Sequence, residues 1–181
     1  MHNFKTIEMS YLTKLKNIKA FVFDVDGVFT DGSVYLLPDK NMSRVMSVLD
    51  GYAVVQSLKQ GYKIGIITGG NDPMVKNRME YLGIKDYYAK SSHKVSDYED
   101  FKLKYNLQDS EILMMGDDIP DIGIMRLAEI AACPANAVPE VKAISDYISP
   151  VFGGKGAVRD VIEQVMKVQG KWNLDEETKS A

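Results

Sequence analysis

Residues 21–32 read FVFDVDGVFTDG, an apolar run that ends in closely spaced aspartates. The β-branched and aromatic residues of this run predict a strand, buried on both faces, over residues 19–26. Side chains alternate along a strand, so Asp24 and Asp26 point to one side if strand geometry continues through them. Like charges this close repel each other, and their burial is costly unless something compensates. The stretch is therefore either a turn that uses aspartate or a cation site, and Asp31 is most simply a turn residue.

Length and composition indicate one globular domain and exclude several classes of protein. The chain has 181 residues, of which 45% are hydrophobic and 26% charged. A formal net charge of -3 predicts no basic surface for nucleic acid. The single cysteine, Cys133, excludes an internal disulfide and fits a reducing compartment, and no cluster of cysteine and histidine indicates zinc. No signal peptide or membrane-spanning stretch is recognisable, so a cytoplasmic protein is expected.

Strand-like and helix-like segments alternate along the rest of the chain. The pattern predicts further strands at residues 62–70, 85–89, 111–118, 130–134 and 146–150. It predicts helices at residues 52–61, 72–83, 91–106, 119–128, 137–145 and 157–169. Such alternation is typical of a Rossmann-like α/β fold, in which helices cover both faces of a parallel sheet. We therefore expect one domain over residues 18–170, with a lead-in at 1–17 and a flexible tail at 171–181.

Short sequence motifs predict a β-hairpin and the N-caps of two helices. Residues 33–48 have two strand-like halves around the turn signal PDKN, which predicts a β-hairpin. Asp72, followed by Pro73, predicts the N-cap of one helix, and serine predicts the cap of the helix at 91–106.

Polar side chains fall where the predicted strands end, and ligands of parallel α/β sheets bind beyond those ends. Asp24 and Asp26 follow the first strand, and Thr68 follows the second. Lys94 lies at the start of the helix after the third strand, and GDDIPD at 116–121 follows the fourth. Carboxylates gathered at one point need a cation, and an all-oxygen set of ligands suits Mg²⁺. Lys94 would then give a positive charge, and Thr68 a hydrogen-bond donor, to phosphoryl oxygens of a ligand.

DVDGV, the threonine of IITGG, Lys94 and GDDIPD, in this order, resemble the four motifs of the haloacid dehalogenase superfamily of phosphotransferases. The resemblance implies that Asp24 is a nucleophile and that Asp26 first protonates the leaving alcohol and then activates water. It implies that Mg²⁺ is held by the carboxylates of Asp24 and Asp117 and by the backbone carbonyl of Asp26. The remaining residues that it implies are Asp118 and Asp121 near the metal and Thr68, Gly69 and Lys94 on the phosphate.

Larger members of this superfamily carry a cap domain over the site. The interval from Asp24 to Thr68 holds the hairpin and one helix, and the interval from Thr68 to Lys94 holds one helix and one strand. Neither interval has room for a cap. An uncapped site must either accept a large substrate or take part of its walls from another subunit.

The segments DVDGVFTDG, LDGYAV, IITGG and GGKGAVRD together resemble the 3-deoxy-D-manno-octulosonate 8-phosphate phosphatases of lipopolysaccharide sugar synthesis. The resemblance covers about residues 18–170 and implies a cytoplasmic homotetramer in which hairpins pack together and neighbouring subunits complete each active site. The apolar side chains of the hairpin fit that role; they are Val34, Tyr35, Leu36, Leu37, Val45, Met46 and Val48. A hairpin that folds onto its own domain is the alternative.

The same resemblance implies substrate contacts from Gly154, Lys155 and Arg159, although GGKGAVRD also reads as a loop before the last helix. Asp50 either contacts sugar hydroxyls or caps the helix that it precedes. Leu49 and Gly70 stand where relatives often have arginine, so the 9-phosphate of a nine-carbon sugar acid remains an alternative substrate.

Two other classes of protein share part of this pattern. A signalling receiver module also gathers aspartates, a threonine and a lysine around a phosphorylated aspartate. In receivers, however, the threonine and lysine follow the phosphorylated residue, whereas Thr68 and Lys94 precede the Gly-Asp-Asp segment here. A pseudoenzyme scaffold is disfavoured because every expected catalytic residue is present. His93, beside Lys94, is interpreted as a solvated residue at a helix start.

Overall fold

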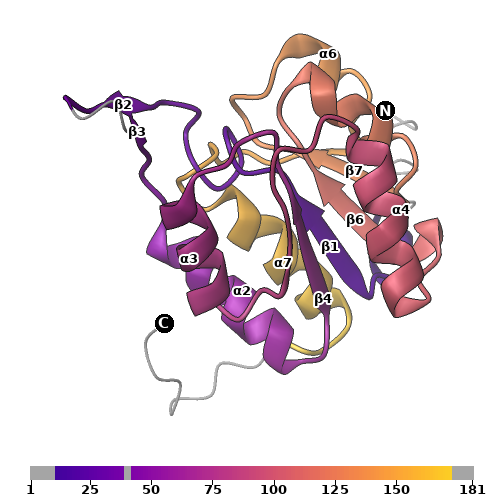
Figure 1. Cartoon of the computed structure of the whole chain (residues 1–181). Helices are drawn as coiled ribbons and strands as arrows, with labels where there is room; N and C mark the ends of the chain where they lie inside the picture. Colours follow the sequence, from indigo (N-terminus) through magenta and orange to yellow (C-terminus); the bar gives the residue numbers. More distant parts are fainter. Residues whose placement is uncertain (1–10, 39–41, 173–181) are drawn as a thin grey trace.

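The computed structural model describes residues 11–38 and 42–172, which form a parallel sheet between two layers of helices (Figure 1). Within these residues the main sheet has six strands in the order β5-β4-β1-β6-β7-β8. In chain order they are β1 (Ala20–Phe23), β4 (Lys63–Ile67), β5 (Asp86–Tyr88), β6 (Ile112–Met115), β7 (Ile130–Cys133) and β8 (Tyr147–Ile148). The predicted α/β fold is confirmed.

Apolar side chains of β1 point alternately into two cores, as the sequence pattern requires. Phe21 and Phe23 join the core under α2 (Val48–Lys59), α3 (Pro73–Tyr81) and α7 (Ala157–Val168). Ala20 and Val22 join the core under α4 (Lys94–Tyr105) and α5 (Ile122–Met125). The remaining short helices are η1 (Asp109–Glu111), η2 (Ile119–Asp121) and α6 (Pro139–Lys142).

The central strand β1 fixes where the strand ends meet. It pairs in parallel with β4 on one side and with β6 on the other, so Phe23 lies opposite both Ile66 and Met115. The segments that follow these strands therefore leave the sheet at the same edge. This register brings the residues after Phe23, Ile67 and Met115 to one place.

The predicted hairpin is present but shorter than expected. It consists of β2 (Tyr35–Leu36) and β3 (Met42–Ser43), and it extends away from the sheet (Figure 1). The turn between these strands, residues 39–41, lies outside the described part of the chain.

The predicted helix starts are partly wrong. Asp72 caps α3 as expected, since its side chain accepts a hydrogen bond from the backbone N–H of Met74. The predicted serine cap of α4 is wrong, because His93 occupies the N-cap position and its side chain makes no capping hydrogen bond. The helix α2, which precedes α3 in the chain, begins at Val48, earlier than predicted, because Ser47 provides its cap.

Both ends of the described chain pack against the domain. Leu15, in the predicted lead-in, is fully buried. Trp172, which the prediction placed in a flexible tail, packs partly buried against the core, while residues 173–181 lie outside the described part. Among the described residues, no helix is both long and apolar enough to cross a membrane.

Candidate active site

A tight turn after β1 sets the position of the first aspartates. The strand ends at Phe23, and the N–H of Asp24 donates to the carbonyl of Met115 on the neighbouring strand. The chain then turns through Gly27, whose φ is 87°, a conformation that favours glycine. A Cβ atom on Gly27 would also lie 1.9 Å from Oδ2 of Asp117. Glycine at this position therefore lets two segments that carry aspartates approach each other.

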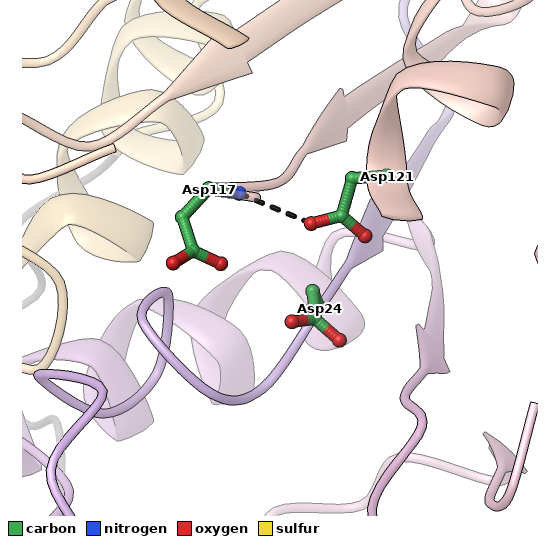
Figure 2. A group of neighbouring side chains, drawn as sticks. All are labelled: Asp24, Asp117 and Asp121. Carbon is green, nitrogen blue, oxygen red and sulfur yellow. Dashed lines mark hydrogen bonds between the residues drawn. The ribbon is translucent and has the colours of Figure 1, made fainter. Parts of the chain in front are cut away.

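Three carboxylates converge above the ends of β1 and β6. Asp24, Asp117 and Asp121 each offer an oxygen within 4.8 Å of the others (Figure 2). Asp121 is held in place because its Oδ2 accepts from the backbone N–H groups of Asp117 at 3.1 Å and Asp118 at 3.4 Å. Asp118 is exposed, and its own carboxylate accepts from the N–H of Ile119. Asp121 therefore belongs to the cluster, while Asp118 lies at its margin.

Lys94 supplies positive charge to this cluster from the start of α4. Its Nζ lies 2.9 Å from Oδ1 of Asp24 and 2.7 Å from Oδ1 of Asp121. Burial acts to lower the pKa of Lys94, but the two carboxylates outweigh it, so the pKa is raised. Lys94 is therefore positively charged at neutral pH.

One lysine does not compensate the whole cluster. Burial and the charge of Asp121 raise the pKa of Asp24 to about 7, although Lys94 acts to lower it. Burial and the charge of Asp24 likewise raise the pKa of Asp117 to about 7. In addition, Oδ1 of Asp117 is buried and has no hydrogen-bond partner among the described residues. These carboxylates fit a hard divalent cation, which takes oxygen ligands and would favour their ionised form.

The predicted phosphate-binding residues line the same cavity. It has a volume of about 460 Å³. Its lining includes Asp24, Asp26, Thr68, Gly69, Gly70, Ser91, Lys94, Asp117, Asp118 and Asp121. Oγ1 of Thr68 accepts from the N–H of Gly70 at 3.1 Å, which positions its hydroxyl hydrogen for an acceptor in the cavity. The structure thus gathers carboxylates, an amine and a hydroxyl group around one cavity.

A comparison with known proteins shows which family has this arrangement. The chain is 33% identical over 165 residues to the 3-deoxy-D-manno-octulosonate 8-phosphate phosphatase of Salmonella typhi, over 91% of this chain and 87% of that protein. The chain belongs to the haloacid dehalogenase-like hydrolases. The family model for haloacid dehalogenase-like hydrolases matches residues 44–129 of this hydrolase.

Solved structures show the same fold. A structure from Legionella pneumophila, described as a superfamily hydrolase of subfamily III A, is 33% identical and covers 94% of each chain with a TM-score of 0.91. The Moraxella catarrhalis 3-deoxy-D-manno-octulosonate 8-phosphate phosphatase, solved with magnesium, phosphate and KDO, is 32% identical, with a TM-score of 0.86. That alignment covers 89% of this chain and 92% of the other. The family resemblance inferred from the motifs is confirmed.

Arg44 of the hydrolase is a site residue that the sequence analysis missed. Its Nε donates to Oδ1 of Asp26 at 2.6 Å, and its Nη2 donates to Oδ2 of Asp26 at 3.2 Å. Its Nη1 also donates to Oδ2 of Asp72 at 3.1 Å. The one available signal was a lone arginine in SRVMSV, between the hairpin and α2.

The loop GGKG, residues 153–156, lies against the turn after β1. The N–H of Gly154 donates to the carbonyl of Val28 at 2.9 Å. Asn136 joins the two loops, because its Oδ1 accepts from the N–H of Gly153 at 2.7 Å and its Nδ2 donates to the carbonyl of Gly27 at 3.3 Å. Gly154 therefore supports the turn after β1.

Lys155 and Arg159, two of the predicted substrate contacts, are not among the residues that line the cavity around Asp24. Both residues line a separate cavity of about 300 Å³. The guanidinium of Arg159 lies 5.6 Å from the ring centres of both Tyr52 and Trp172, and its Nε pairs with Glu163 at 3.1 Å. Arg159 thus has structural contacts within its own chain.

Asp50 also has a structural role that corrects both earlier interpretations. Its side chain is fully buried, and its Oδ1 accepts from the backbone N–H of Arg159 at 2.8 Å. It therefore supports the start of α7, whereas Ser47 caps the helix that contains Asp50. Burial raises the pKa of Asp50 to about 6, even though N–H groups of α7 act to lower it.

Proposed function

We propose that the hydrolase is a Mg²⁺-dependent phosphatase of a sugar-acid phosphate, with 3-deoxy-D-manno-octulosonate 8-phosphate as its substrate. The observation that carries this proposal is the cluster of Asp24, Asp117 and Asp121 with Lys94, which faces Thr68 across one cavity. The relatives from Salmonella typhi and Moraxella catarrhalis carry the name of this activity, and the Moraxella structure contains magnesium, phosphate and KDO. A 9-phosphate of a nine-carbon sugar acid is the second candidate. Leu49 and Gly70 stand where 3-deoxy-D-manno-octulosonate 8-phosphate phosphatases often have arginine.

The residues support a reaction in two steps. In the first step an oxygen of Asp24 attacks phosphorus, the bond from phosphorus to the leaving oxygen breaks, and Asp26 donates a proton to that oxygen. In the second step Asp26 takes a proton from water, which attacks the aspartyl phosphate and releases phosphate and free Asp24. Lys94 and Thr68 orient and neutralise the phosphoryl oxygens in both steps. Bound Mg²⁺, held by Asp24, Asp117, the Asp26 carbonyl and Asp121 nearby, would offset the charge on the phosphoryl group.

Phosphate release with Mg²⁺ across a panel of sugar phosphates tests this function. We expect the highest kcat/KM for 3-deoxy-D-manno-octulosonate 8-phosphate among eight-carbon, nine-carbon and neutral sugar phosphates. A preference for a nine-carbon 9-phosphate would keep the mechanism and change the substrate. The absence of turnover on every ester, together with lasting phosphorylation of Asp24, would instead support a receiver-like switch.

We further propose that the hydrolase acts in the cytoplasm as a homotetramer, in which the hairpins meet and each active site borrows residues from a neighbour. The hairpin exposes large apolar side chains: Tyr35 is 60% and Leu36 79% exposed. It also extends beyond the domain, where a second subunit can reach it (Figure 1). Lys155, which is outside the catalytic cavity of its own subunit, would then be available to an adjacent one.

Substitution of the hairpin tests this assembly. We expect Leu36→Lys to lower the mass measured by sedimentation and to lower kcat/KM, because a charge in an apolar interface is costly. Leu103→Lys on α4, where Leu103 is 83% exposed, is the matched control and should leave the mass unchanged. An unchanged mass for Leu36→Lys would contradict assembly through the hairpin.

A further inference from the structure

A buried carboxylate that does not line the catalytic cavity lies between α2 and α7. Asp50, in the first turn of α2, is fully buried. Its Oδ1 accepts from the backbone N–H of Arg159 at 2.8 Å, whereas its Oδ2 is buried and has no hydrogen-bond partner among the described residues. Burial of a carboxylate with an unpaired oxygen destabilises a protein unless the group stabilises another part of it. The segment that Asp50 stabilises therefore indicates what this residue does.

The start of α7 has no side-chain cap from its own segment. Its N-cap is Gly156, which has a φ of 117° and no side chain to accept from the N–H groups of the first turn. Asp50 supplies an acceptor from α2, and its negative charge suits the N-terminal end of the helix dipole. The two helices also pack against each other. Removal of this carboxylate should therefore loosen the first turn of α7 and the GGKG loop, which ends at that turn.

The GGKG loop connects the start of α7 to the turn after β1. The N–H of Gly154 donates to the carbonyl of Val28 at 2.9 Å. A Cβ atom on Gly153 would lie 1.8 Å from the carbonyl oxygen of Gly27, so the backbones of the loop and the turn are in direct contact. A Cβ atom on Gly27 would in turn lie 1.9 Å from Oδ2 of Asp117, a member of the carboxylate cluster. A shift of the loop therefore shifts the turn against this cluster.

We propose that Asp50 is a positioning residue for the reaction and that it acts, through the start of α7 and the GGKG loop, on the turn that carries Asp26. This assignment rests on the proposed phosphatase function. Thr68 and Lys94, the residues proposed to bind the phosphoryl group, follow β4 and β5 and do not belong to this path. Loss of the Asp50 carboxylate should therefore lower kcat more than it raises KM.

Substitution of Asp50 tests this role with the best substrate of the ester panel. Asp50→Ala removes the carboxylate without adding volume. We expect it to lower kcat by about tenfold or more, because small displacements of reacting groups have large effects on rate. KM should change by less than about threefold. Asp50→Asn keeps an oxygen that accepts from the N–H of Arg159 and should restore most of kcat.

Amide hydrogen exchange gives a readout that does not depend on catalysis. In the turn after β1, the N–H groups of Val28, Phe29 and Thr30 all donate to the carbonyl of Val25. We expect Asp50→Ala to accelerate exchange of these three amides by about tenfold, the effect of losing one hydrogen bond to a charged group. Asp50→Asn should leave their exchange close to that of wild type.

Val165→Ala on the same helix is the matched control. Val165 is fully buried in the core and lies further along α7 than the contact with Asp50. Its truncation should lower Tm through a cavity but leave kcat and exchange in the turn close to those of wild type. A fall in kcat that only reflects lower stability would appear in both variants.

Asn136→Ala tests the same path from an exposed position, and it remains informative if Asp50→Ala does not fold. Asn136 joins the GGKG loop to the turn through Gly153 and Gly27. We expect this variant also to lower kcat with little change in KM. The double variant should lower kcat by less than the product of the two separate effects, because both residues act through one loop.

The outcomes separate this role from the phosphatase function. If Asp50→Ala lowers kcat no more than Val165→Ala does at an equal loss of Tm, the positioning role is wrong. A fall in kcat with unchanged exchange in the turn would overturn it too, as would a normal kcat for Asn136→Ala. If wild type releases phosphate from no ester of the panel, the phosphatase function is wrong and the catalytic part of this proposal falls with it. Amide exchange would then still show whether Asp50 orders the turn.

Discussion

Asp24→Asn should lower kcat for phosphate release by at least about 1000-fold, because the amide cannot form the aspartyl phosphate. The side chain is 10% exposed and contacts Lys94, so water has little room to replace the missing nucleophile. Single-turnover assays with Mg²⁺ should also show no phosphorylated enzyme. Both readouts concern chemistry, so substrate binding is measured separately by calorimetry.

The matched control for this substitution is Asp31→Asn in the same segment. Oδ1 of Asp31 accepts from the N–H of Ser33 at 2.9 Å in an exposed turn, and asparagine preserves that bond. We expect near-normal turnover for Asp31→Asn. Near-normal turnover for Asp24→Asn would show that another group attacks the phosphorus.

Asp24→Asn should at the same time stabilise the metal-free protein at neutral pH. Burial raises the pKa of Asp24 from 3.8 to about 7, so between these values the folded state holds a proton that the unfolded state has lost. The free energy of unfolding therefore falls as the pH rises through this window. Thermal melts without metal at about pH 5 and about pH 8 should show a smaller loss of Tm for Asp24→Asn than for wild type. Mg²⁺ should restore Tm in wild type and do so less in the variant.

Gly153→Ala should be the most destabilising of the substitutions considered. A Cβ atom at this position would lie 1.8 Å from the carbonyl oxygen of Gly27 and 2.7 Å from that of Thr30. Both are backbone atoms, so no side chain can rotate away, and the two loops must separate. We expect a loss of at least about 3 kcal/mol in the free energy of unfolding, which corresponds to a fall in Tm of roughly 6 °C or more. Turnover should fall too, because the displaced turn carries Asp26.

Gly69→Ala is the stability control for this prediction. Nothing lies within 4 Å of a Cβ atom built on Gly69, and its backbone does not have a positive φ. Chemical denaturation should therefore give a free energy of unfolding close to that of wild type. If Gly153→Ala unfolded at the same denaturant concentration as Gly69→Ala, the close contact between the GGKG loop and the turn after β1 would be disproved.

The sequence by itself determined the order of strands and helices along the chain and the meeting of Asp24 with Asp117 and Asp121. The apolar run before Asp24 is long enough and β-branched enough to require a buried strand, and the runs before Thr68 and Asp117 repeat the pattern. Parallel pairing then places the residues after these strands at one edge. The order of the elements follows from local periodicity and short spacings along the chain. It does not depend on contacts between distant segments, and the position of ligands beyond the strand ends follows from the fold class.

Only the tertiary structure decided what the residues around that cluster do. Arg44 reaches Asp26, the carboxylate of Asp50 supports α7, and the guanidinium of Arg159 packs against Tyr52 and Trp172. Each of these contacts joins two different elements or loops, and a polar side chain can pair with any partner within its reach. The partner is selected by how the helices and the hairpin pack on the sheet, and residue type and spacing along the chain do not record that packing.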